Sequence, residues 1–358
     1  MNVDLDAAQR SSGAVFAPFG GIDLPVRFAD LRAEWSAVRQ RCGLIDARFR
    51  ALLRATGTDR IGFLQGMVSN DVAGLRDGAG TYAALLTQQG KVVSDLRIYA
   101  LADELWLDVP AARATAVRES LERYVVADDV EFVAAEPWTP LVVLEGPLAA
   151  RTLVAVTGES LAPVPSLAHR EVDFDGTRLR VVAATHGGEA GFMLCGDNAV
   201  GGTLWEHCRA AGAEPVGMEA LNVLRLEAGI PWHGWDMDET TLVAEVGLET
   251  AISYEKGCYL GQEVVERVAA RGQVHRKLRG LTCAGGVAPA AGAPLTRDGQ
   301  EVGWITSAVW SPACAAVIAL GYLRRECCEP DTEVEVALPA GSVSARVTPL
   351  PFYAPRSA

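Results

Sequence analysis

Residues 253–267 read SYEKGCYLGQEVVER and concentrate several reactive side chains in a short segment. Cys258 is the nucleophile among them, because a thiolate attacks electrophilic centres and binds soft metals. Gly257 and Gly261 permit tight or positive-φ backbone around it. We expect a helix over residues 262–271, which places Cys258 just before a helix N-terminus.

The amides of that helix and the nearby Lys256 ammonium would favour a Cys258 thiolate. A nucleophilic cysteine also needs a base, and His275 is the nearest histidine in the sequence. A buried, inert cysteine in a turn is the alternative for any single thiol. No second ligand stands at a useful spacing, so we expect no metal site.

The carboxylate of Asp95 is a second candidate, because it lies in the middle of an apolar strand. Alternation along the strand places Asp95, Arg97 and Tyr99 on one face. Burying an unpaired carboxylate is costly. An inward-facing Asp95 could hydrogen-bond to or protonate a ligand nitrogen, whereas an outward-facing one would be a solvated residue beside Arg97. The sequence leaves both alternatives open.

Two further segments could contact a ligand. A basic run could receive a carboxylate-rich or phosphate-bearing tail, or could form a solvated face. Its members are Arg267, Arg271, His275, Arg276, Lys277 and Arg279. The stretch HGGEAG, which starts at His186, could approach a ligand closely or could be a turn between strands. It lacks the strand-to-helix context of a dinucleotide-binding loop.

The 358 residues carry a net charge of −13. This charge argues against a general nucleic-acid binder, because nonspecific affinity depends on phosphate neutralisation. A small anionic ligand in one basic pocket is compatible with it. The start of the chain has no signal-peptide pattern and no apolar run is long enough to span a bilayer, so we expect a cytoplasmic protein without membrane contact. The eight cysteines form no CxxC pair, and we expect reduced thiols.

The order of the elements predicts an α+β fold, because strands and helices mix without strict alternation. Strands are expected over residues 91–101, 104–109, 141–145, 178–185 and 191–195, and helices over 58–67, 111–125, 203–211 and 218–228. From about residue 275 helical signals vanish. Strand-like stretches at 277–283, 302–309, 314–323 and 333–338 predict a small all-β domain, a barrel. The predicted domains are therefore 1–274 and 275–358.

The stretch KGCYLGQE, with the arginine that follows it, resembles the signature of the YgfZ-type folate-binding proteins. Longer stretches resemble the glycine-cleavage T-protein (aminomethyltransferase) superfamily: GTDRIGFLQGMVSNDV, YAALLTQQGKVVSDLRIYAL and LRLEAGIPWHGWDMDETTLVAEVGL. GWITSAVWSP and ALGYL resemble the terminal barrel of that superfamily. The resemblance covers about residues 15–353.

The resemblance implies a three-lobed cloverleaf around a folate-binding cavity, with two lobes of ferredoxin-like β/α units before the barrel. It implies tetrahydrofolate or a one-carbon derivative as the ligand. For the YgfZ-type branch it implies a required cysteine and a role in iron–sulfur protein maturation, with assembly or client proteins as partners. The signature residues are Lys256, Gly257, Cys258, Tyr259, Gly261, Gln262, Glu263 and Arg267.

The aminomethyltransferase branch has an acidic residue where this chain has Asp95, near the folate nitrogens that carry the one-carbon unit. It also has a Tyr-Thr-Gly-Glu-x-Gly-aromatic-Glu segment, whereas this chain has HGGEAGFM. His186 replaces the tyrosine and Met193 the last carboxylate, and losing that charge-assisted contact would cost about 1.5–3 kcal/mol. Glu189 or Glu227 could substitute. The ligand-binding candidates are Asp95, His186, Glu189, Arg225 and Glu227.

These observations lead to three hypotheses for the function. The signature and the altered HGGEAGFM segment favour a tetrahydrofolate-binding accessory protein for iron–sulfur cluster assembly or repair, with Cys258 and Asp95 as catalytic candidates. Asp95 and the LRLEAG segment support the alternative, a folate-dependent aminomethyltransferase. A hydrolase or redox enzyme that uses Cys258 without folate is the third hypothesis.

Overall fold

The computed structural model describes residues 4–161, 164–271, 274–339 and 341–355. The chain divides into two compact units. Unit 1 comprises Met1–Leu85, Val93–Leu221 and Thr250–Leu260, and unit 2 comprises Leu86–Val92, Asn222–Glu249 and Gly261–Ala358. The chain therefore leaves unit 1 and later returns to it. The domain boundary predicted at residue 275 stays a prediction.

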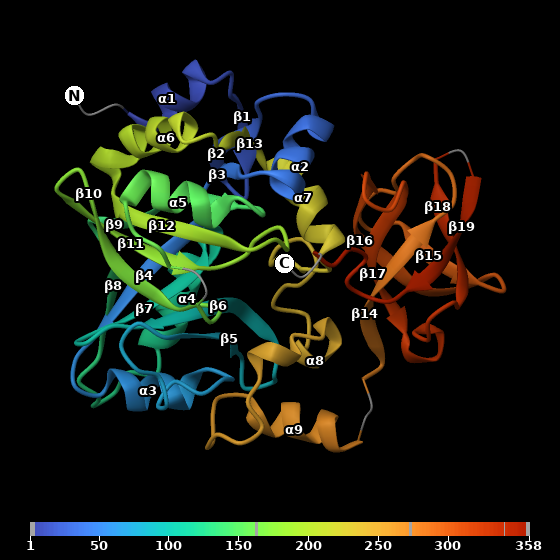
Figure 1. Cartoon of the computed structure of the whole chain (residues 1–358). Helices are drawn as coiled ribbons and strands as arrows, with labels where there is room; N and C mark the ends of the chain where they lie inside the picture. The colour runs from blue at the N-terminus through green and yellow to red at the C-terminus, as the bar shows by residue number, and fades with distance from the viewer. Residues whose placement is uncertain (1–3, 162–163, 272–273, 340, 356–358) are drawn as a thin grey trace. The chain divides into compact units, whose positions relative to one another are not determined.

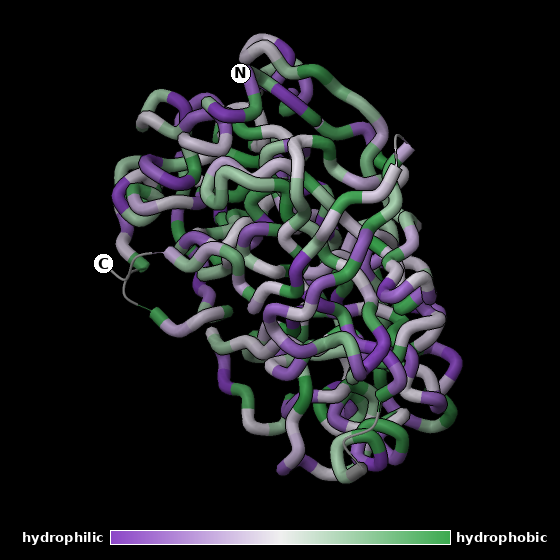
Figure 2. Tube along the Cα trace, turned by 90° about the vertical axis from the view of Figure 1, so that its right-hand side faces the viewer, coloured by the Kyte–Doolittle hydropathy of each residue, from purple (hydrophilic) through white to green (hydrophobic). Residues whose placement is uncertain are grey.

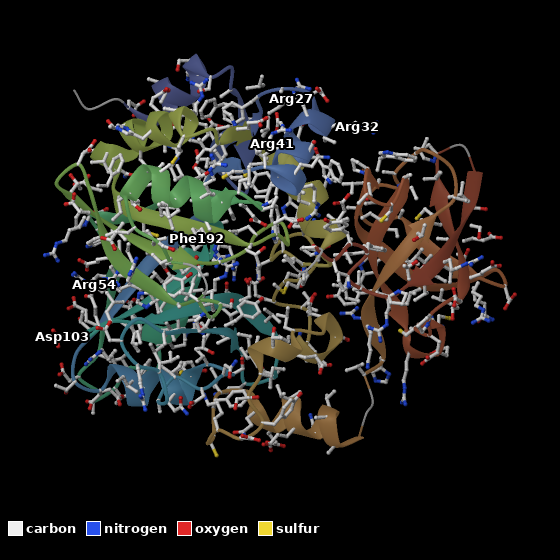
Figure 3. All side chains as sticks on the ribbon, viewed as in Figure 1. Arg27, Arg32, Arg41, Arg54, Asp103 and Phe192 are labelled. Carbon is white, nitrogen blue, oxygen red and sulfur yellow. The ribbon has the colours of Figure 1, made fainter. Side chains whose placement is uncertain are left out.

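Unit 1 is built on two sheets (Figure 1). The six-stranded sheet has the order β10 (His169–Phe174), β11 (Thr177–Ala183), β12 (Gly191–Asp197), β9 (Trp138–Glu145), β3 (Gly43–Asp46) and β13 (Glu214–Val216). The five-stranded sheet has the order β5 (Gly80–Leu86), β6 (Val92–Ala100), β7 (Leu105–Pro110), β4 (Arg50–Thr56) and β8 (Glu131–Ala134). In the six-stranded sheet β13 runs parallel to β3, and the ion pair of Arg41 (Figure 3) with Glu214 supports this edge.

Helices cover one face of each sheet. On the six-stranded sheet, α1 (Leu5–Ser11), α5 (Ala149–Thr157) and α6 (Gly201–Ala210) share an apolar core with Phe192 of β12 (Figure 3). On the five-stranded sheet, α3 (Arg60–Met67) and α4 (Ala114–Glu122) share a core with Leu96 and Ile98 of β6. The amphipathic patterns of α4 and α5 explain which side each of these two helices buries.

The other faces of the two sheets pack against each other. The rings of Tyr99 on β6 and His169 on β10 lie 5.5 Å apart between their centroids. Those of Trp106 on β7 and Trp138 on β9 lie 5.4 Å apart. Polar residues on these faces are therefore enclosed between two sheets and largely removed from solvent.

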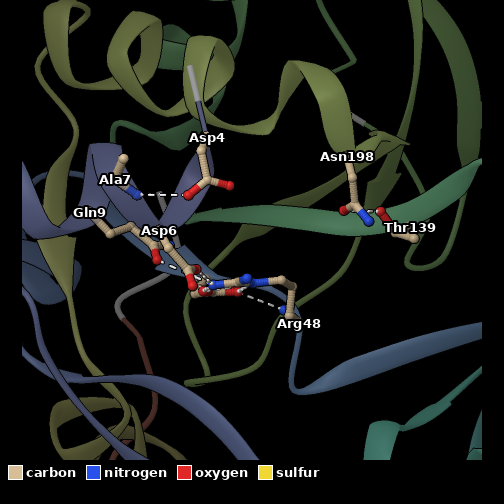
Figure 4. A network of polar contacts seen from close by, with 8 residues as sticks. Asp4, Asp6, Ala7, Gln9, Arg48, Thr139 and Asn198 are labelled. Carbon is tan, nitrogen blue, oxygen red and sulfur yellow. Dashed lines mark hydrogen bonds and ion pairs between the residues drawn. The ribbon is translucent and has the colours of Figure 1, made fainter. Parts of the chain in front are cut away.

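The N-terminal segment of unit 1 is held by charge. Arg48 donates to Asp6 and to Asp46, each at 2.6 Å, and Gln9 donates to Asp46 at 2.9 Å (Figure 4). This network fastens α1 to the end of β3. A hairpin of β1 (Val15–Phe19) and β2 (Ile22–Arg27) and the helix α2 (Leu31–Gln40) follow.

Unit 2 contains a closed barrel in the order β14 (Arg276–Cys283), β17 (Ala316–Arg324), β16 (Gln300–Ser311), β15 (Pro294–Arg297), β18 (Glu333–Leu338) and β19 (Gly341–Thr348). Closure leaves no unpaired sheet edge. Inward residues of alternate positions, among them Leu281, Ile305 and Val336, form its core. The predicted α+β fold with a C-terminal β-barrel is confirmed.

Outside the barrel, the described part of unit 2 contains the end of α7 (Met218–Glu227) and the helices α8 (Val243–Val246) and α9 (Gln262–Arg271). Helix α9 has the predicted bounds. The helix predicted to start with Thr58 as its N-cap instead starts at Arg60, because the Thr58 hydroxyl donates to Asp129 at 2.8 Å.

Apolar and polar residues interleave along the trace (Figure 2). Within the part of the chain that the structure describes, no helix is long and apolar enough to cross a membrane.

Gly303 on β16 provides a test of the barrel packing. A Cβ at this position would lie 1.9 Å from the Tyr322 carbonyl oxygen of β17, a backbone atom that cannot move aside. We expect Gly303→Ala to lower the free energy of unfolding by about 3 kcal/mol, as overpacking does. Gly286→Ala is the control, because nothing lies within 4 Å of its Cβ position. Urea denaturation of both variants measures this, and equal stability would contradict the barrel register.

Candidate functional site

Asp95 lies on the enclosed face of the five-stranded sheet. Only 9% of the residue is exposed, so the inward alternative is the one observed. The Tyr82 hydroxyl donates to Asp95 Oδ2 at 3.2 Å. Burial raises the pKa of Tyr82, and the charge of Asp95 raises it further, so the phenol stays protonated. Among the described residues Tyr82 is the one hydrogen-bond partner of this carboxylate, which therefore keeps acceptor capacity.

Asp108 on β7 forms the centre of a polar cluster beside Asp95. It accepts from Arg50 Nε at 2.6 Å and from the Tyr99 hydroxyl at 2.7 Å, and Arg97 Nη1 lies 3.6 Å away. Burial alone would lower the pKa of Arg50, but the charges of Asp108 and Asp95 more than offset it. Within this cluster, two guanidinium groups thus balance two carboxylates.

The segment between β11 and β12 is organised by Glu145, the last residue of β9. Its carboxylate accepts from the backbone N–H groups of His186, Gly187 and Glu189 at 2.9, 2.7 and 3.0 Å. It also accepts from the Thr185 hydroxyl at 3.0 Å. Burial raises the pKa of Glu145, and these four donors oppose that shift. The glycine-rich stretch is therefore a turn between strands whose backbone is held by a buried acid.

His186 joins this loop to the polar cluster. Its Nε2 lies 3.1 Å from Arg97 Nη1, and the Thr185 carbonyl accepts from Arg97 Nη2 at 2.8 Å. Burial lowers the pKa of His186 well below its usual value, and the charges of Arg97 and Arg50 lower it further. The ring is neutral. Because Arg97 can only donate, Nε2 is the acceptor and the ring proton sits on Nδ1.

Glu189 is one of the two residues that could substitute for the missing carboxylate. Glu189 is buried and forms an ion pair with Arg39 at 2.8 Å. Its negative charge is therefore already matched by a neighbour. Met193 is fully buried within β12. Contact of Glu189 with a ligand stays a prediction.

Arg225 and Glu227, the other ligand-binding candidates, lie at the end of α7 in unit 2. Arg225 is fully buried and donates to Asp236 and to Ser307, the latter at 2.9 Å. Glu227 is also buried and accepts from the Ser311 hydroxyl at 2.6 Å. These internal contacts favour a structural role for both residues, and ligand contact stays a prediction.

The signature segment shows a different use of Lys256 from the predicted one. Its ammonium donates to the carbonyl oxygens of Gln65, Val68 and Asn70 at 2.7, 2.7 and 2.9 Å. Burial lowers the pKa of Lys256 to about 8. The ammonium therefore caps the C-terminal end of α3, where carbonyl oxygens lack helical partners. Its predicted effect on Cys258 stays a prediction.

The remaining signature residues are distributed as follows. Cys258 is exposed, which corrects the alternative of a buried thiol. Gly261 has φ +84°, as predicted, whereas Gly257 has no positive φ. Tyr259 is buried, with its ring 5.2 Å from the Lys256 ammonium. On α9, Glu263 and Arg267 are exposed and Gln262 donates to Glu266. The described residues contain no group of acidic, cysteine and histidine side chains that could hold a metal.

Sequence analysis did not identify Tyr82, Arg50, Asp108 and Glu145 as parts of the site. A signal was available for two of them. Asp108 in LWLDVP and Glu145 in LVVLEG are carboxylates within or at the end of apolar strands, as Asp95 is. The rule applied to Asp95 would have selected them.

Two family models match the chain. Residues 5–256 match the GCVT N-terminal domain, and residues 276–354 match the glycine cleavage T-protein C-terminal barrel domain. The chain belongs to the glycine cleavage T-protein family. Membership of this family supports the expected tetrahydrofolate or one-carbon derivative as ligand.

Similar proteins match almost the whole length of this chain. It is 33% identical over 357 residues to an aminomethyltransferase of Prochlorococcus marinus (strain MIT 9303), covering 96% of this chain and 95% of the relative. It is 32% identical over 356 residues to an aminomethyltransferase of Geobacillus sp. (strain WCH70), with 98% and 97% covered. The crystal structure of glycine cleavage system aminomethyltransferase T from Bartonella henselae superposes with a TM-score of 0.90 at 26% identity, with 97% and 96% covered.

These relatives correct the functional hypothesis that the signature favoured. Proteins about one-third identical over nearly the full length are named aminomethyltransferases, so an iron–sulfur accessory function is wrong as the main hypothesis. The family matches support the T-protein superfamily and do not place this chain in the YgfZ-type branch. The iron–sulfur hypothesis depended on the short stretch KGCYLGQE, whereas the longer stretches that resemble the T-protein superfamily supported the aminomethyltransferase alternative.

The neutral His186 predicts acid sensitivity. Histidine in the unfolded chain titrates near pH 6.5, as a typical value, whereas the folded pKa of His186 is depressed. Below about pH 6.5 the unfolded state therefore binds more protons, and stability falls as the pH falls. His169, with its pKa lowered to about 4 by burial and then by Arg180, acts in the same direction.

His186→Gln keeps an acceptor for Arg97 and removes the titration. We expect the slope of unfolding free energy between about pH 6.5 and 5 to fall by up to about 1.4 kcal/mol per pH unit. Urea denaturation at a series of pH values measures the slope. An unchanged slope would contradict a neutral, buried His186.

Proposed function

We propose that this chain is a tetrahydrofolate-dependent aminomethyltransferase of the glycine-cleavage type. The observation that carries the proposal is the inward Asp95 carboxylate with remaining acceptor capacity, in a chain whose near-full-length relatives are named aminomethyltransferases. In this reaction tetrahydrofolate takes up the carbon of an aminomethylated lipoyl carrier as a methylene group. The bonds from that carbon to the lipoyl sulfur and to the amine nitrogen break, and the reduced lipoyl carrier and ammonia leave.

The residues around Asp95 fit a folate substrate. A pterin presents several N–H donors, and an ionised carboxylate accepts hydrogen bonds more strongly than a neutral group does. Arg50 and Arg97 on the same enclosed face provide the compensating charge. In a setting poor in water, a fixed carboxylate stabilises positive charge that develops on a bound nitrogen more than it would in bulk solvent.

Within this proposal Tyr82 orients the carboxylate. Its hydroxyl engages Oδ2 of Asp95 and leaves Oδ1 to accept from a substrate nitrogen. We propose folate and an aminomethylated lipoyl carrier as the partners. A cytoplasmic location, a boundary at residue 275 and a functional role for Cys258 stay predictions.

Asp95→Asn keeps the size of the side chain and removes its charge. We expect turnover of an aminomethylated lipoyl carrier to methylene-tetrahydrofolate to fall at least about 100-fold, the range typical of a lost preorganised electrostatic contact. Asp103→Asn is the matched control, because it makes the same change at an exposed carboxylate outside the Asp95 cluster, and its activity should stay within about two-fold of wild type.

Folate binding can be tested separately from turnover, by the thermal stabilisation of the wild-type protein. Saturating tetrahydrofolate should stabilise the wild-type protein by about 2.7 kcal/mol at 100 times the Kd. A thermal shift that stays at zero far above micromolar ligand would contradict folate binding, whatever the variants do. A fully active Asp95→Asn variant would contradict the role of the carboxylate.

Tyr82→Phe and Tyr99→Phe form a matched pair. Each removes one buried phenol hydroxyl, from Asp95 in the first variant and from Asp108 in the second. We expect Tyr82→Phe to lower kcat/KM about ten-fold, the equivalent of one hydrogen bond to a charged group. Tyr99→Phe should lower Tm and leave kcat/KM near wild type. Steady-state kinetics with equal losses in both variants would contradict orientation of Asp95 by Tyr82.

A further inference from the structure

Glu145 has no direct contact with Asp95, yet its surroundings are unusual for a carboxylate. It is fully buried, and both oxygens accept hydrogen bonds. All four donors come from one short loop, residues 185–189. A buried carboxylate is tolerated when such donors satisfy it. The loop backbone is therefore fixed by one side chain from the neighbouring strand.

Glu34 on α2 has the same chemistry in the same unit. It is buried and accepts from the backbone N–H groups of Phe28, Ala29 and Gly217 at 2.6, 2.7 and 2.7 Å. Burial raises its pKa, as it raises that of Glu145, and backbone donors oppose the shift in both. The two glutamates differ in whether the backbone segment that they hold contacts Arg97.

The loop held by Glu145 contacts the side chain of Arg97. The His186 ring and the Thr185 carbonyl accept from the two Nη atoms of Arg97, at 3.1 and 2.8 Å. Arg97 follows Asp95 by two residues on β6, so both side chains lie on the same face of the strand. The backbone held by Glu34 makes no described contact with Arg97.

We propose that Glu145 is a positioning residue for the substrate-binding carboxylate, acting through the 185–189 loop and Arg97 on Asp95. Loss of the Glu145 charge releases the loop, and the Arg97 guanidinium then loses two fixed acceptors. Its position beside Asp95 and Asp108 changes, which alters the electrostatic field that the substrate nitrogen meets. This inference rests on the proposed aminomethyltransferase function.

The ion pair of Arg39 with Glu189 holds the same loop from another side, since Arg39 also donates to the Gly187 carbonyl at 3.3 Å. The loop is therefore anchored twice. Removing the Glu145 charge should shift the loop without unfolding unit 1, so the effect should appear in substrate binding more than in the overall fold.

The experiment compares Glu145→Gln with Glu34→Gln. Each variant replaces one buried carboxylate that holds backbone N–H groups, so both should lower Tm. We expect Glu145→Gln to raise the KM for tetrahydrofolate about ten-fold, as small displacements of positioning groups do, while Glu34→Gln keeps the wild-type KM. Equal KM changes in both variants, or none in Glu145→Gln, would overturn the proposal.

A milder variant covers the case in which Glu145→Gln does not fold. Thr185→Val removes one of the four donors to Glu145 and keeps the carbonyl that Arg97 uses. We expect a smaller rise in KM, of about three-fold, in the same direction. A wild-type KM for Thr185→Val would count against the proposal.

Nitrogen NMR of the His186 ring separates this inference from the proposed function. Wild type should show a neutral ring protonated on Nδ1, and Glu145→Gln should move the Nε2 resonance as the Arg97 contact loosens. An unmoved resonance overturns positioning by Glu145, even if the enzyme turns over. A moved resonance in a protein that neither binds nor turns over tetrahydrofolate supports the positioning of Arg97 and refutes the aminomethyltransferase proposal.

Discussion

Charge balance between the two sheets of unit 1 is the constraint on which the rest of the unit depends. Asp108, Asp95 and Arg50 are buried and Arg97 is partly buried, so the cluster holds two charges of each sign. Removing one member would leave an uncompensated buried charge, at about 3–5 kcal/mol. The balance holds only when β4, β6 and β7 keep their register, with Arg97 opposite Asp108. The strand register that keeps these charges paired therefore also fixes the position of Asp95 in the candidate site.

Unit 2 also contains a buried carboxylate, Asp236, and a separate hydrogen-bond network compensates its charge. Asp236 Oδ1 accepts from Thr306 and Ser307 at 2.6 Å each, and its Oδ2 accepts from Arg225 and the Trp232 backbone. These contacts join the end of α7 and the loop after it to strand β16. All the lone pairs of Asp236 are used, and Arg225 is thereby held within unit 2.

Sequence patterns were sufficient for much of the fold. The alternation that placed Asp95 and Arg97 on one face of β6 is local, and so is the periodicity that delimits α9. Short elements such as β13 and β15 carry too few residues for a pattern. The partners of Asp95 were missed because Tyr82 and Arg50 come from other strands, and pairing across strands depends on register. The three carbonyl acceptors of Lys256 are likewise distant in sequence, so the sequence suggested a thiol partner for it.

The return of Thr250–Leu260 to unit 1 has a consequence for biosynthesis. Lys256 binds the carbonyl oxygens at the end of α3, and the Ser253 N–H donates to the Ser69 carbonyl at 2.9 Å, so this segment completes the surroundings of α3. A ribosome must therefore release Asn222–Glu249, which belongs to unit 2, before unit 1 is complete. N-terminal units generally fold first during translation. In this chain, unit 1 stays incomplete until residues 250–260 have been synthesised. Until then the carbonyl oxygens at the end of α3 lack the Lys256 ammonium, and chaperones could bind the incomplete unit.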